Sequence, residues 1–173
     1  MGDIDKFIEQ YSARAYAAAY RLTGNEADAW DLVQEAFLRA LEKSDLYDPA
    51  FDFGGWLYRI LFRVYLNRRR AQGRRREIPL EPACDGDSPG AGEPIAAREE
   101  SPPAIAERNE AMARISGALD RLSDELRACI VLVDVEGRSY EEAAGILDWP
   151  VGSVSGRVFR ARRLMREMLE PRG

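Results

Sequence analysis

The strongest constraint on the fold of this chain is a central stretch, residues 77–105, that cannot form part of a packed core. This stretch contains six prolines and three glycines and has almost no large apolar side chains. Proline removes a backbone donor and clashes with the preceding helical turn, while glycine favours irregular backbone. Seven acidic residues here are opposed by one base, Arg98. We therefore expect a flexible acidic linker that divides the chain into two blocks, residues 1–76 and 106–173.

Both blocks are predicted to be helical, because their apolar residues recur every three or four positions and strand-like alternation is scarce. The composition, 46% hydrophobic and 32% charged, is that of an ordinary globular protein. The fold class that follows is all-α, with two small helical domains. After a first helix that ends near residues 24–25, we expect helices over about residues 26–41, 56–70, 140–147 and 151–169.

Residue types that most enzymes and metal sites need are missing. There is no histidine, which excludes Ser-His and Cys-His nucleophilic sites and any imidazole acid or base. Cys84 and Cys129 are far apart, so neither a disulfide framework nor a zinc site with paired ligands is expected. We therefore expect no catalytic residue, no metal and no cofactor.

The sequence also lacks the signs of a membrane or secreted protein. No apolar run approaches the roughly 18 residues of a membrane span. Neither a basic region nor an apolar stretch of the kind found in signal peptides follows Met1. We expect a cytoplasmic protein with no membrane insertion.

Charge is distributed unevenly, although the net charge of −5 argues at first against a nucleic-acid partner. Residues 1–52 hold eleven acids against five bases. No acid occurs between Asp52 and Glu77, where the first of two basic groups lies. The groups are Arg59, Arg63, Arg68, Arg69, Arg70, Arg74, Arg75 and Arg76, and Arg157, Arg160, Arg162, Arg163 and Arg166. This asymmetry indicates two surfaces that contact a polyanion. It also indicates an acidic face that contacts a different partner.

The expected helix over residues 56–70 carries apolar residues on two sides. One side has Trp56, Leu57, Ile60, Leu61 and Val64, and the other has Tyr58, Phe62, Tyr65 and Leu66 beside Arg59 and Arg69. One apolar stripe is enough for a surface helix. This helix is therefore either buried on two faces or uses the second face to stack on a ligand such as an unpaired base.

The end of the sequence has the pattern of a helix-turn-helix. Ser139 and Glu142 have the spacing of a capping box for the short helix over residues 140–147. A break at Asp-Trp-Pro precedes the longer helix over residues 151–169. That helix carries arginines opposite its apolar stripe, where a recognition helix faces the major groove. The alternative, a helical hairpin with a solvated basic face, stays open at this point.

Five segments together resemble a known family. Residues 28–40 (DAWDLVQEAFLRA) and 53–60 (FGGWLYRI) resemble region 2 of bacterial RNA polymerase sigma factors of the extracytoplasmic function (ECF) class. Residues 119–123 (LDRLS), 136–144 (EGRSYEEAA) and 150–162 (PVGSVSGRVFRAR) resemble region 4 of that class. The resemblance covers nearly the whole chain apart from the linker. Motifs of both regions, found in the right order, are more specific than the motifs of one region alone.

The resemblance implies a specificity subunit and not a catalyst. The polymerase would synthesise the RNA, and this chain would select the promoter at which synthesis starts. Region 2 would occupy residues 1–76 and region 4, with its helix-turn-helix, residues 106–173. The linker, residues 77–105, would thread toward the polymerase active centre. The implied partners are core RNA polymerase, through its β′ clamp and β flap, promoter DNA, and an anti-sigma factor.

The resemblance also implies site residues. Core polymerase would be contacted by Asp28, Asp31, Gln34, Glu35 and Arg39. The −10 element would be opened and held by Phe53, Trp56, Tyr58, Arg59, Arg63, Asn67 and Arg69. The −35 element would be read by Ser153, Ser155, Arg157, Arg160, Arg162, Arg163 and Arg166. Capture of a single strand at −10 would account for aromatic residues beside arginines.

Two positions depart from the pattern of the family. Ser155 and Gly156 stand where many members carry a basic residue followed by serine, and Arg63 stands where asparagine is common. The −35 and −10 preferences of this chain are therefore left open by its sequence.

Two other classes of protein share parts of this pattern. A stand-alone helix-turn-helix regulator, whose N-terminal helices dimerise or bind a ligand, would have a dimeric mass and a palindromic site. A magnesium-dependent nucleic-acid enzyme needs carboxylates that converge on a pocket, whereas the acids of the predicted second helix line its outer face. The sigma factor is the favoured interpretation, with the regulator as its alternative.

Overall fold

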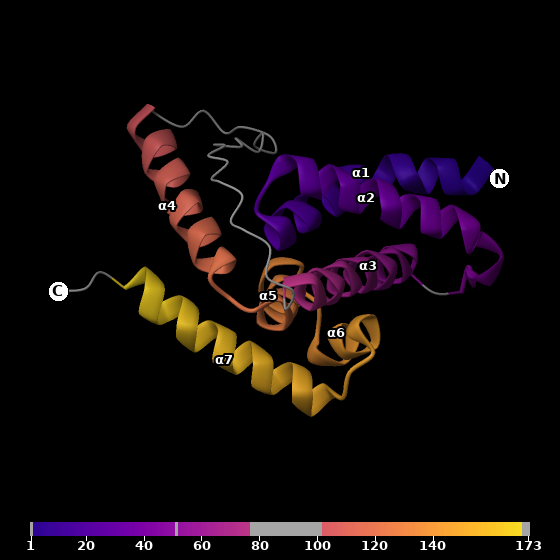
Figure 1. Ribbon diagram of the computed structural model, residues 1–173. Helices are drawn as coiled ribbons and strands as arrows, with labels where there is room; N and C mark the ends of the chain where they lie inside the picture. The colour runs from indigo at the N-terminus through magenta and orange to yellow at the C-terminus, as the bar shows by residue number, and fades with distance from the viewer. Residues whose placement is uncertain (1, 51, 77–101, 171–173) are drawn as a thin grey trace.

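The computed structural model of the protein describes residues 2–50, 52–76 and 102–170, and its secondary structure within these ranges is entirely helical (Figure 1). The predicted all-α fold is confirmed. Most of the predicted linker, including Cys84, lies outside the described residues. Its last residues are already helical from Pro102, and proline suits the first turn of a helix. None of the described helices is both long enough and apolar enough to cross a membrane.

The N-terminal half begins with two helices that lie side by side, α1 (Gly2–Thr23) and α2 (Glu26–Glu42). The predicted break between them is correct. Gly24 adopts a φ of +77°, and its N–H donates to the Tyr20 carbonyl at 2.8 Å, which closes α1. Asn25 then caps α2, because its side chain accepts a hydrogen bond from a backbone N–H of the first turn at 2.8 Å.

A single 3-10 turn, η1 (Ser44–Leu46), leads to the long helix α3 (Phe53–Arg76). α3 begins earlier than predicted because Asp52 caps it. The Asp52 carboxylate accepts hydrogen bonds from the backbone N–H groups of Gly54 at 3.2 Å and Gly55 at 2.8 Å. Gly54 and Gly55, which precede the predicted start of this helix at residue 56, therefore belong to its first turn.

The C-terminal half consists of α4 (Pro102–Asp120), α5 (Asp124–Ile130), the π-helical turn η2 (Val131–Val135), α6 (Tyr140–Leu147) and α7 (Val151–Leu169). The predicted bounds of the last two helices are confirmed. So is the capping box, because the Glu142 N–H donates to Ser139 Oγ at 3.1 Å and the Ser139 N–H donates to the Glu142 carboxylate at 2.8 Å. Between α6 and α7, Asp148 adopts the left-handed conformation with φ at 59°.

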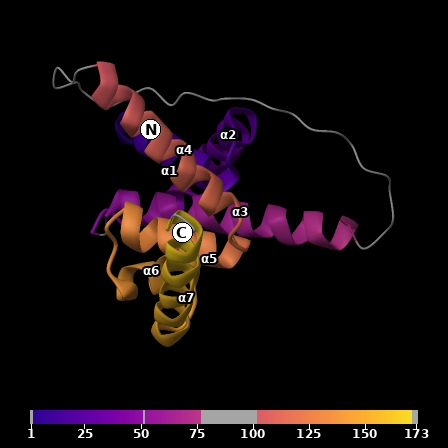
Figure 2. The same cartoon turned by 90° about the vertical axis from the view of Figure 1, so that its left-hand side faces the viewer.

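The two halves pack against each other and share one hydrophobic core. α3 lies between the α1–α2 pair on one side and α5 and α6 on the other (Figures 1 and 2). Leu57 and Leu61 on one side of α3 are buried, and so are Tyr58 and Tyr65 on the side that meets the C-terminal half, each of them 2% exposed. Of the two alternatives for this helix, burial on two faces is the one the structure has.

Arg127 of α5 joins the two halves from within. Its side chain is buried, and its Nη1 donates a hydrogen bond of 2.7 Å to the Leu22 carbonyl in the last turn of α1. The same nitrogen lies 3.4 Å from the carboxylate of Asp120. Its Nε has no hydrogen-bond partner, and burial of an unsatisfied polar atom costs free energy. Arg127 therefore supplies a hydrogen-bond donor to a carbonyl at the end of α1, while its own Nε stays without an acceptor.

Replacing Gly24 by alanine should destabilise the protein, because an L-residue in the left-handed region costs about 1–2 kcal/mol. The added Cβ would also lie 2.6 Å from Oδ1 of Asp120. Gly145→Ala is the matched control, since a Cβ there meets nothing within 4 Å inside α6, and it should stabilise the protein by about 0.5–1 kcal/mol. Urea unfolding measures both changes, and effects of the same sign would contradict this account of the turn.

Candidate nucleic-acid interface

α3 presents a third face that neither half covers, because successive residues turn by about 100° around a helix. This face, the cationic stripe, consists of Arg59, Arg63, Asn67 and Arg70, and all four side chains are exposed. Cations in a row along one helix are suited to the phosphates of a nucleic-acid strand. The cationic stripe is therefore the surface of α3 on which a strand can lie.

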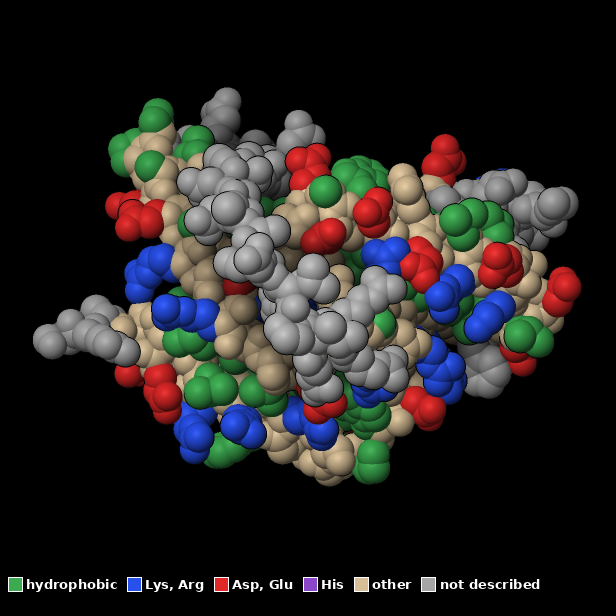
Figure 3. Space-filling model, viewed as in Figure 1, with side chains coloured by type: hydrophobic (Ala, Val, Ile, Leu, Met, Phe, Trp, Pro, Cys, Tyr) green, Lys and Arg blue, Asp and Glu red, His purple; other side chains and the backbone are tan. Residues whose placement is uncertain are grey.

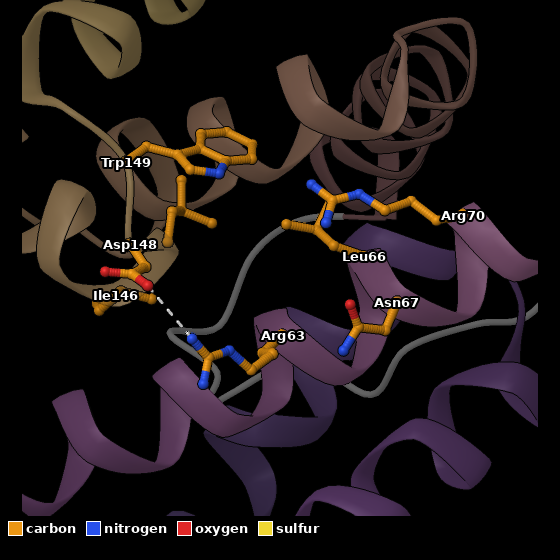
Figure 4. Close-up of a pocket in the computed structure, with 8 residues that line it drawn as sticks. Arg63, Leu66, Asn67, Arg70, Ile146, Asp148 and Trp149 are labelled. Atoms are coloured by element: carbon orange, nitrogen blue, oxygen red, sulfur yellow. Dashed lines mark hydrogen bonds and ion pairs between the residues drawn. The ribbon is translucent and has the colours of Figure 1, made fainter.

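Asp148 of the C-terminal half faces the cationic stripe. Its carboxylate lies 3.4 Å from Nη2 of Arg63 and 3.9 Å from Nη2 of Arg59. Figure 4 shows the contact with Arg63 at a cavity of about 210 Å³ between α3 and the turn from α6 to α7. Asn67 and Arg70 line the same cavity, and no carboxylate of the described residues pairs with Arg70. The stripe is thus partly neutralised and partly open.

Two further carboxylates of the C-terminal half accept hydrogen bonds from α3. The Tyr65 hydroxyl donates to Asp124 at 3.0 Å, and Nε of Arg69 donates to the same oxygen at 2.8 Å. The Tyr58 hydroxyl donates to Glu136 at 2.6 Å, and the Glu136 side chain is only 8% exposed. Burial, and after it the neighbouring carboxylate, raises the pKa of each phenol above its usual value. Both hydroxyls are therefore permanent donors at physiological pH.

The residues predicted to contact the −10 element fall into an exposed and a buried set. The exposed set is Arg59, Arg63, Asn67 and Arg69. Phe53 is buried and stacks on Phe7 with ring centroids 4.6 Å apart. Trp56 is half-buried, with its ring centroid 5.1 Å from that of Tyr47. Tyr58 is buried against the C-terminal half, so in this arrangement it cannot stack on a base.

The beginning of α3 is also tied to the C-terminal half, through Asp52. Nη1 of Arg138 lies 3.4 Å from the Asp52 carboxylate, and the Arg138 guanidinium lies 5.4 Å from the centre of the Tyr58 ring. Burial disfavours the charge of Asp52. Hydrogen bonds from the backbone of Gly55 and Gly54, together with Arg138, outweigh burial and hold the pKa of Asp52 below its usual value.

The residues predicted to contact core polymerase lie on α2, and several already have partners. Glu35 pairs with Arg39 at 2.6 Å and with Arg68 of α3, whose Nε donates to it at 2.6 Å. Asp28 accepts a hydrogen bond of 2.7 Å from the side chain of Asn25, the cap of α2. Glu35 therefore also joins α2 to α3, while Arg39 pairs with it from within α2.

The remaining two, Asp31 and Gln34, are exposed and share a face of α2 with two leucines. Leu38 is 61% exposed. Leu41 is exposed as well, although the three-four spacing of apolar residues in this helix predicts that it is buried. The buried stripe of α2 ends in Ala40, and Leu41 points about 100° away from it. Large apolar side chains left in solvent beside polar ones are typical of a surface that a partner covers.

α7 carries the residues predicted to read the −35 element, and two of its arginines are held within the C-terminal half. Nη2 of Arg157 donates to Glu125 at 2.8 Å, and its guanidinium lies 4.6 Å from the centre of the Trp149 ring. Arg162 forms two parallel hydrogen bonds to Asp134, of 2.9 and 2.5 Å. Such bidentate pairs fix the geometry of both side chains.

The outward face of α7 carries the exposed Arg160, Arg163 and Arg166. Ser153 and Ser155, nearer the start of the helix, are half-buried. Arg163 lies 3.7 Å from Glu167, whereas no carboxylate of the described residues pairs with Arg160 or Arg166. Phe159 is 73% exposed. Lys and Arg side chains gather along the lower edge of the molecule in Figure 3, where α7 runs. This helix is a second cationic surface, separate from the cationic stripe.

The sequence did not reveal the residues that join the halves. Arg127 and the carboxylates of Asp124, Glu136 and Asp148 contact partners between 55 and 105 positions away along the chain. A capping box is visible in four consecutive residues. A contact across such a separation leaves no pattern in a single sequence.

Comparison with known proteins agrees with this geometry. Residues 7–75 match the Sigma-70 region 2 family, and residues 112–165 match the Sigma-70, region 4 family. The chain is 37% identical over 165 residues to the ECF RNA polymerase sigma factor SigE of Mycolicibacterium smegmatis, which covers 95% of this chain and 61% of SigE. It is 36% identical over 147 residues to the ECF RNA polymerase sigma-E factor of Escherichia coli K12, which covers 83% and 75% of the two chains.

A solved structure supports the same assignment over the full length of both chains. The sigma factor RpoE of Bartonella quintana, solved in complex with the anti-sigma factor NepR, has a TM-score of 0.74 to this protein, covers 100% of each chain and shares 26% identity. The chain belongs to the ECF family of bacterial RNA polymerase sigma factors.

The stability of the protein should fall in acid as Asp52 takes up a proton. Its pKa is lowered in the folded state, so the unfolded chain binds the proton first, near pH 4. The stability that Asp52 contributes is present above that pH and is lost as the pH falls through the folded pKa. Asp52→Asn keeps a capping side chain that does not titrate, so its urea unfolding should change less between about pH 7 and about pH 3. Asp45→Asn, an exposed position of η1, should behave as the unaltered protein, and equal acid sensitivity of all three would contradict the assignment.

Proposed function

We propose that this sigma factor binds core RNA polymerase and directs it to promoters, with the N-terminal half at the −10 element and the C-terminal half at the −35 element. The observation that carries the proposal is the pair of separate cationic surfaces, the cationic stripe of α3 and the outward face of α7. Each lies in a segment that matches one DNA-reading region of the family. Two separated surfaces suit two separated promoter elements.

The exposed face of α2 is the proposed contact with the β′ clamp of core polymerase. Asp31 and Gln34 supply polar contacts there, while Leu38 and Leu41 supply apolar area. An interface of this mixed kind has an apolar centre and a polar rim. The C-terminal half would contact the β flap. Because the polymerase is a cytoplasmic enzyme, the protein would act in the cytoplasm.

At the −10 element, Arg59, Arg63, Asn67 and Arg69 are the proposed contacts with the non-template strand. Trp56, half-buried beside them, is the aromatic residue most accessible to a base. Tyr58 and Phe53 become accessible only if their present neighbours move. Stacking on Tyr58 would therefore require the two halves to separate first, whereas stacking on Phe53 would require the rings of its own half that cover it to move.

At the −35 element, we place Arg160 and the exposed Phe159 in the major groove. An arginine that is free of carboxylates can form a bidentate contact with guanine, and an aromatic ring can contact a thymine methyl group. Ser153, Ser155 and Arg157 lie in the first turns of α7, which is where a recognition helix meets base edges. Arg163 and Arg166 would contact phosphates, and Arg162 would do so only if it released Asp134.

The protein would perform no chemistry itself and would act by adding weak contacts. Two DNA-binding surfaces of modest affinity bind more tightly when one rigid polymerase holds both, because binding of the first raises the effective concentration of the second. The net charge of −5 would mute the attraction of the free subunit for phosphates. Promoter binding would then be tight only in the holoenzyme.

We further propose that an anti-sigma factor controls this protein. The Bartonella quintana sigma factor that it superposes on over its full length was solved in complex with one. A partner of that kind would hold the two halves in the arrangement seen here. The alternative, a stand-alone regulator, has no observation in its favour, and a monomeric mass in solution would count against it.

The test of the proposed function is run-off transcription from sheared genomic DNA of the source bacterium with core polymerase, with and without this protein, followed by sequencing of RNA 5′ ends. We expect new starts that share −10 and −35 elements. A control sigma factor shows that the core polymerase is active. No new starts under those conditions would contradict the proposal and favour the stand-alone regulator.

Arg160→Ala should lower initiation at these promoters roughly tenfold or more, because loss of one bidentate base contact costs about 1–3 kcal/mol. The matched control is Arg162→Ala, whose side chain is already bonded to Asp134. The control should keep most of its initiation and lose at most about 1 kcal/mol of stability. Initiation rates and urea unfolding of both variants measure this, and an equal loss of initiation would contradict the roles given to the two arginines.

A further inference from the structure

The guanidinium of Arg157, in the second turn of α7, is held from three directions. Its Nε and Nη2 donate to the same carboxylate oxygen of Glu125 at 3.1 and 2.8 Å. Its Nη1 donates to the carbonyl of Ser153, one turn earlier in α7, at 3.2 Å. The centre of the Trp149 ring lies 4.6 Å from the guanidinium carbon, within the range of a cation–π contact. These contacts together leave a long and otherwise flexible side chain little freedom.

Two donors of the same guanidinium stay available. Arginine carries five N–H donors in a rigid planar fork. Glu125 accepts from Nε and from one N–H of Nη2, and the Ser153 carbonyl accepts from one N–H of Nη1. One N–H on each terminal nitrogen therefore remains without an acceptor among the described residues. The Arg157 side chain is 32% exposed, so a ligand can reach this end of the fork.

The two side chains that hold Arg157 come from firmly packed parts of the C-terminal half. Glu125 is the second residue of α5, and the rest of that helix is buried. Trp149 lies in the turn between α6 and α7, where it is half-buried and packs against the hydrophobic core. Its backbone N–H donates to the Ala144 carbonyl of α6 at 3.1 Å. The guanidinium is thus fixed relative to the whole half and not only to its own helix.

We propose that Glu125 and Trp149 are positioning residues for reading of the −35 element: they fix Arg157 so that its two remaining N–H groups contact one guanine. Guanine presents O6 and N7 to the major groove, and a bidentate arginine is the contact that distinguishes it from other bases. Neither positioning residue touches DNA. The inference rests on the proposed function, because it concerns the same recognition helix, and it adds which residues make one arginine of that helix specific.

Prior positioning favours both affinity and specificity. A side chain that is already held loses less conformational entropy when it binds. A mobile arginine can also exchange a base for a neighbouring phosphate, which carries no sequence information. Arg160, one turn further along α7, is exposed and has no carboxylate partner within the described ranges. The two arginines therefore differ in how firmly the protein itself sets their direction.

The test uses the full-length protein with Glu125→Ala, Trp149→Leu and Trp149→Phe. Alanine removes the acceptor, leucine removes the aromatic ring, and phenylalanine keeps a ring for the cation–π contact. The matched control is Glu141→Ala, because Glu141 is an exposed acid and the second residue of α6, as Glu125 is the second residue of α5. Loss of a first-turn carboxylate from a helix is therefore common to the variant and the control.

Two readouts are used. The first is the initiation rate of the reconstituted holoenzyme on a promoter found by the run-off assay, with every single base substitution in its −35 and −10 elements. Arg157→Ala identifies the base pair that this arginine reads. The second is the NMR order parameter of the Arg157 Nε–H in the free protein, assigned with Arg157→Lys and compared with that of Arg160.

We expect the unaltered protein to prefer guanine at the base pair read by Arg157 roughly tenfold or more, as one bidentate contact allows. Glu125→Ala and Trp149→Leu should each lower that preference about two- to fivefold, the range of an exposed charged or cation–π contact, and should leave the −10 preferences unchanged. Trp149→Phe should restore most of the preference, and Glu141→Ala should match the unaltered protein. The Arg157 Nε–H should be more ordered than that of Arg160 and should lose order in Glu125→Ala and in Trp149→Leu.

A Glu125→Ala protein that initiates faster on every −35 sequence alike would overturn the proposal, because Glu125 would then only cancel a charge. Unchanged base preferences in Glu125→Ala and Trp149→Leu would overturn it too, and so would an Arg157 Nε–H as mobile as that of Arg160. The NMR readout contains neither polymerase nor DNA. Failure of the run-off assay with an ordered Arg157 that loosens in both variants would therefore count against the proposed function and still support the positioning, whereas normal run-off with unchanged preferences would count against this inference alone.

Discussion

The burial of two adjacent faces of α3 is the constraint on which the rest of this structure depends. Leu57 and Leu61 place the helix in the N-terminal half, and Tyr58 and Tyr65 place it in the C-terminal half. A helix that is apolar on two sides needs cover on both. The cationic stripe lies on the side of α3 that these two cores leave to solvent.

The interface between the halves combines apolar packing with polar contacts that are individually imperfect. Glu136 is buried but hydrogen-bonded to a phenol, while Arg127 is buried with one nitrogen unsatisfied. Buried charges contribute little net stability once their desolvation is counted. An interface of this kind fixes one arrangement of the halves without making it irreversible.

Local features of the fold could be predicted from the sequence, and long-range ones could not. The capping box at Ser139, the turn at Gly24 and the bounds of α6 and α7 depend on a few consecutive residues, and their predictions are confirmed. The aromatic side of this helix, with Tyr58, Phe62 and Tyr65, could be recognised in the sequence. Whether these rings are buried in a core or stack on a ligand could not be decided without knowing which residues pack against them. The carboxylates that face α3 resembled any other surface acids, because their role comes from partners more than fifty positions away.

Through the hydrogen bond from Arg127 to the Leu22 carbonyl, the interface between the halves also stabilises the last turn of α1. The last carbonyls of a helix have no partner inside that helix, so α1 depends on the other half for one of them. When the halves part, this carbonyl and Nε of Arg127 both gain water, and the last turn of α1 is free to fray toward Gly24. Separation would thus leave this helix end held only by bonds within its own half, and any conformational entropy gained there would offset part of the lost packing.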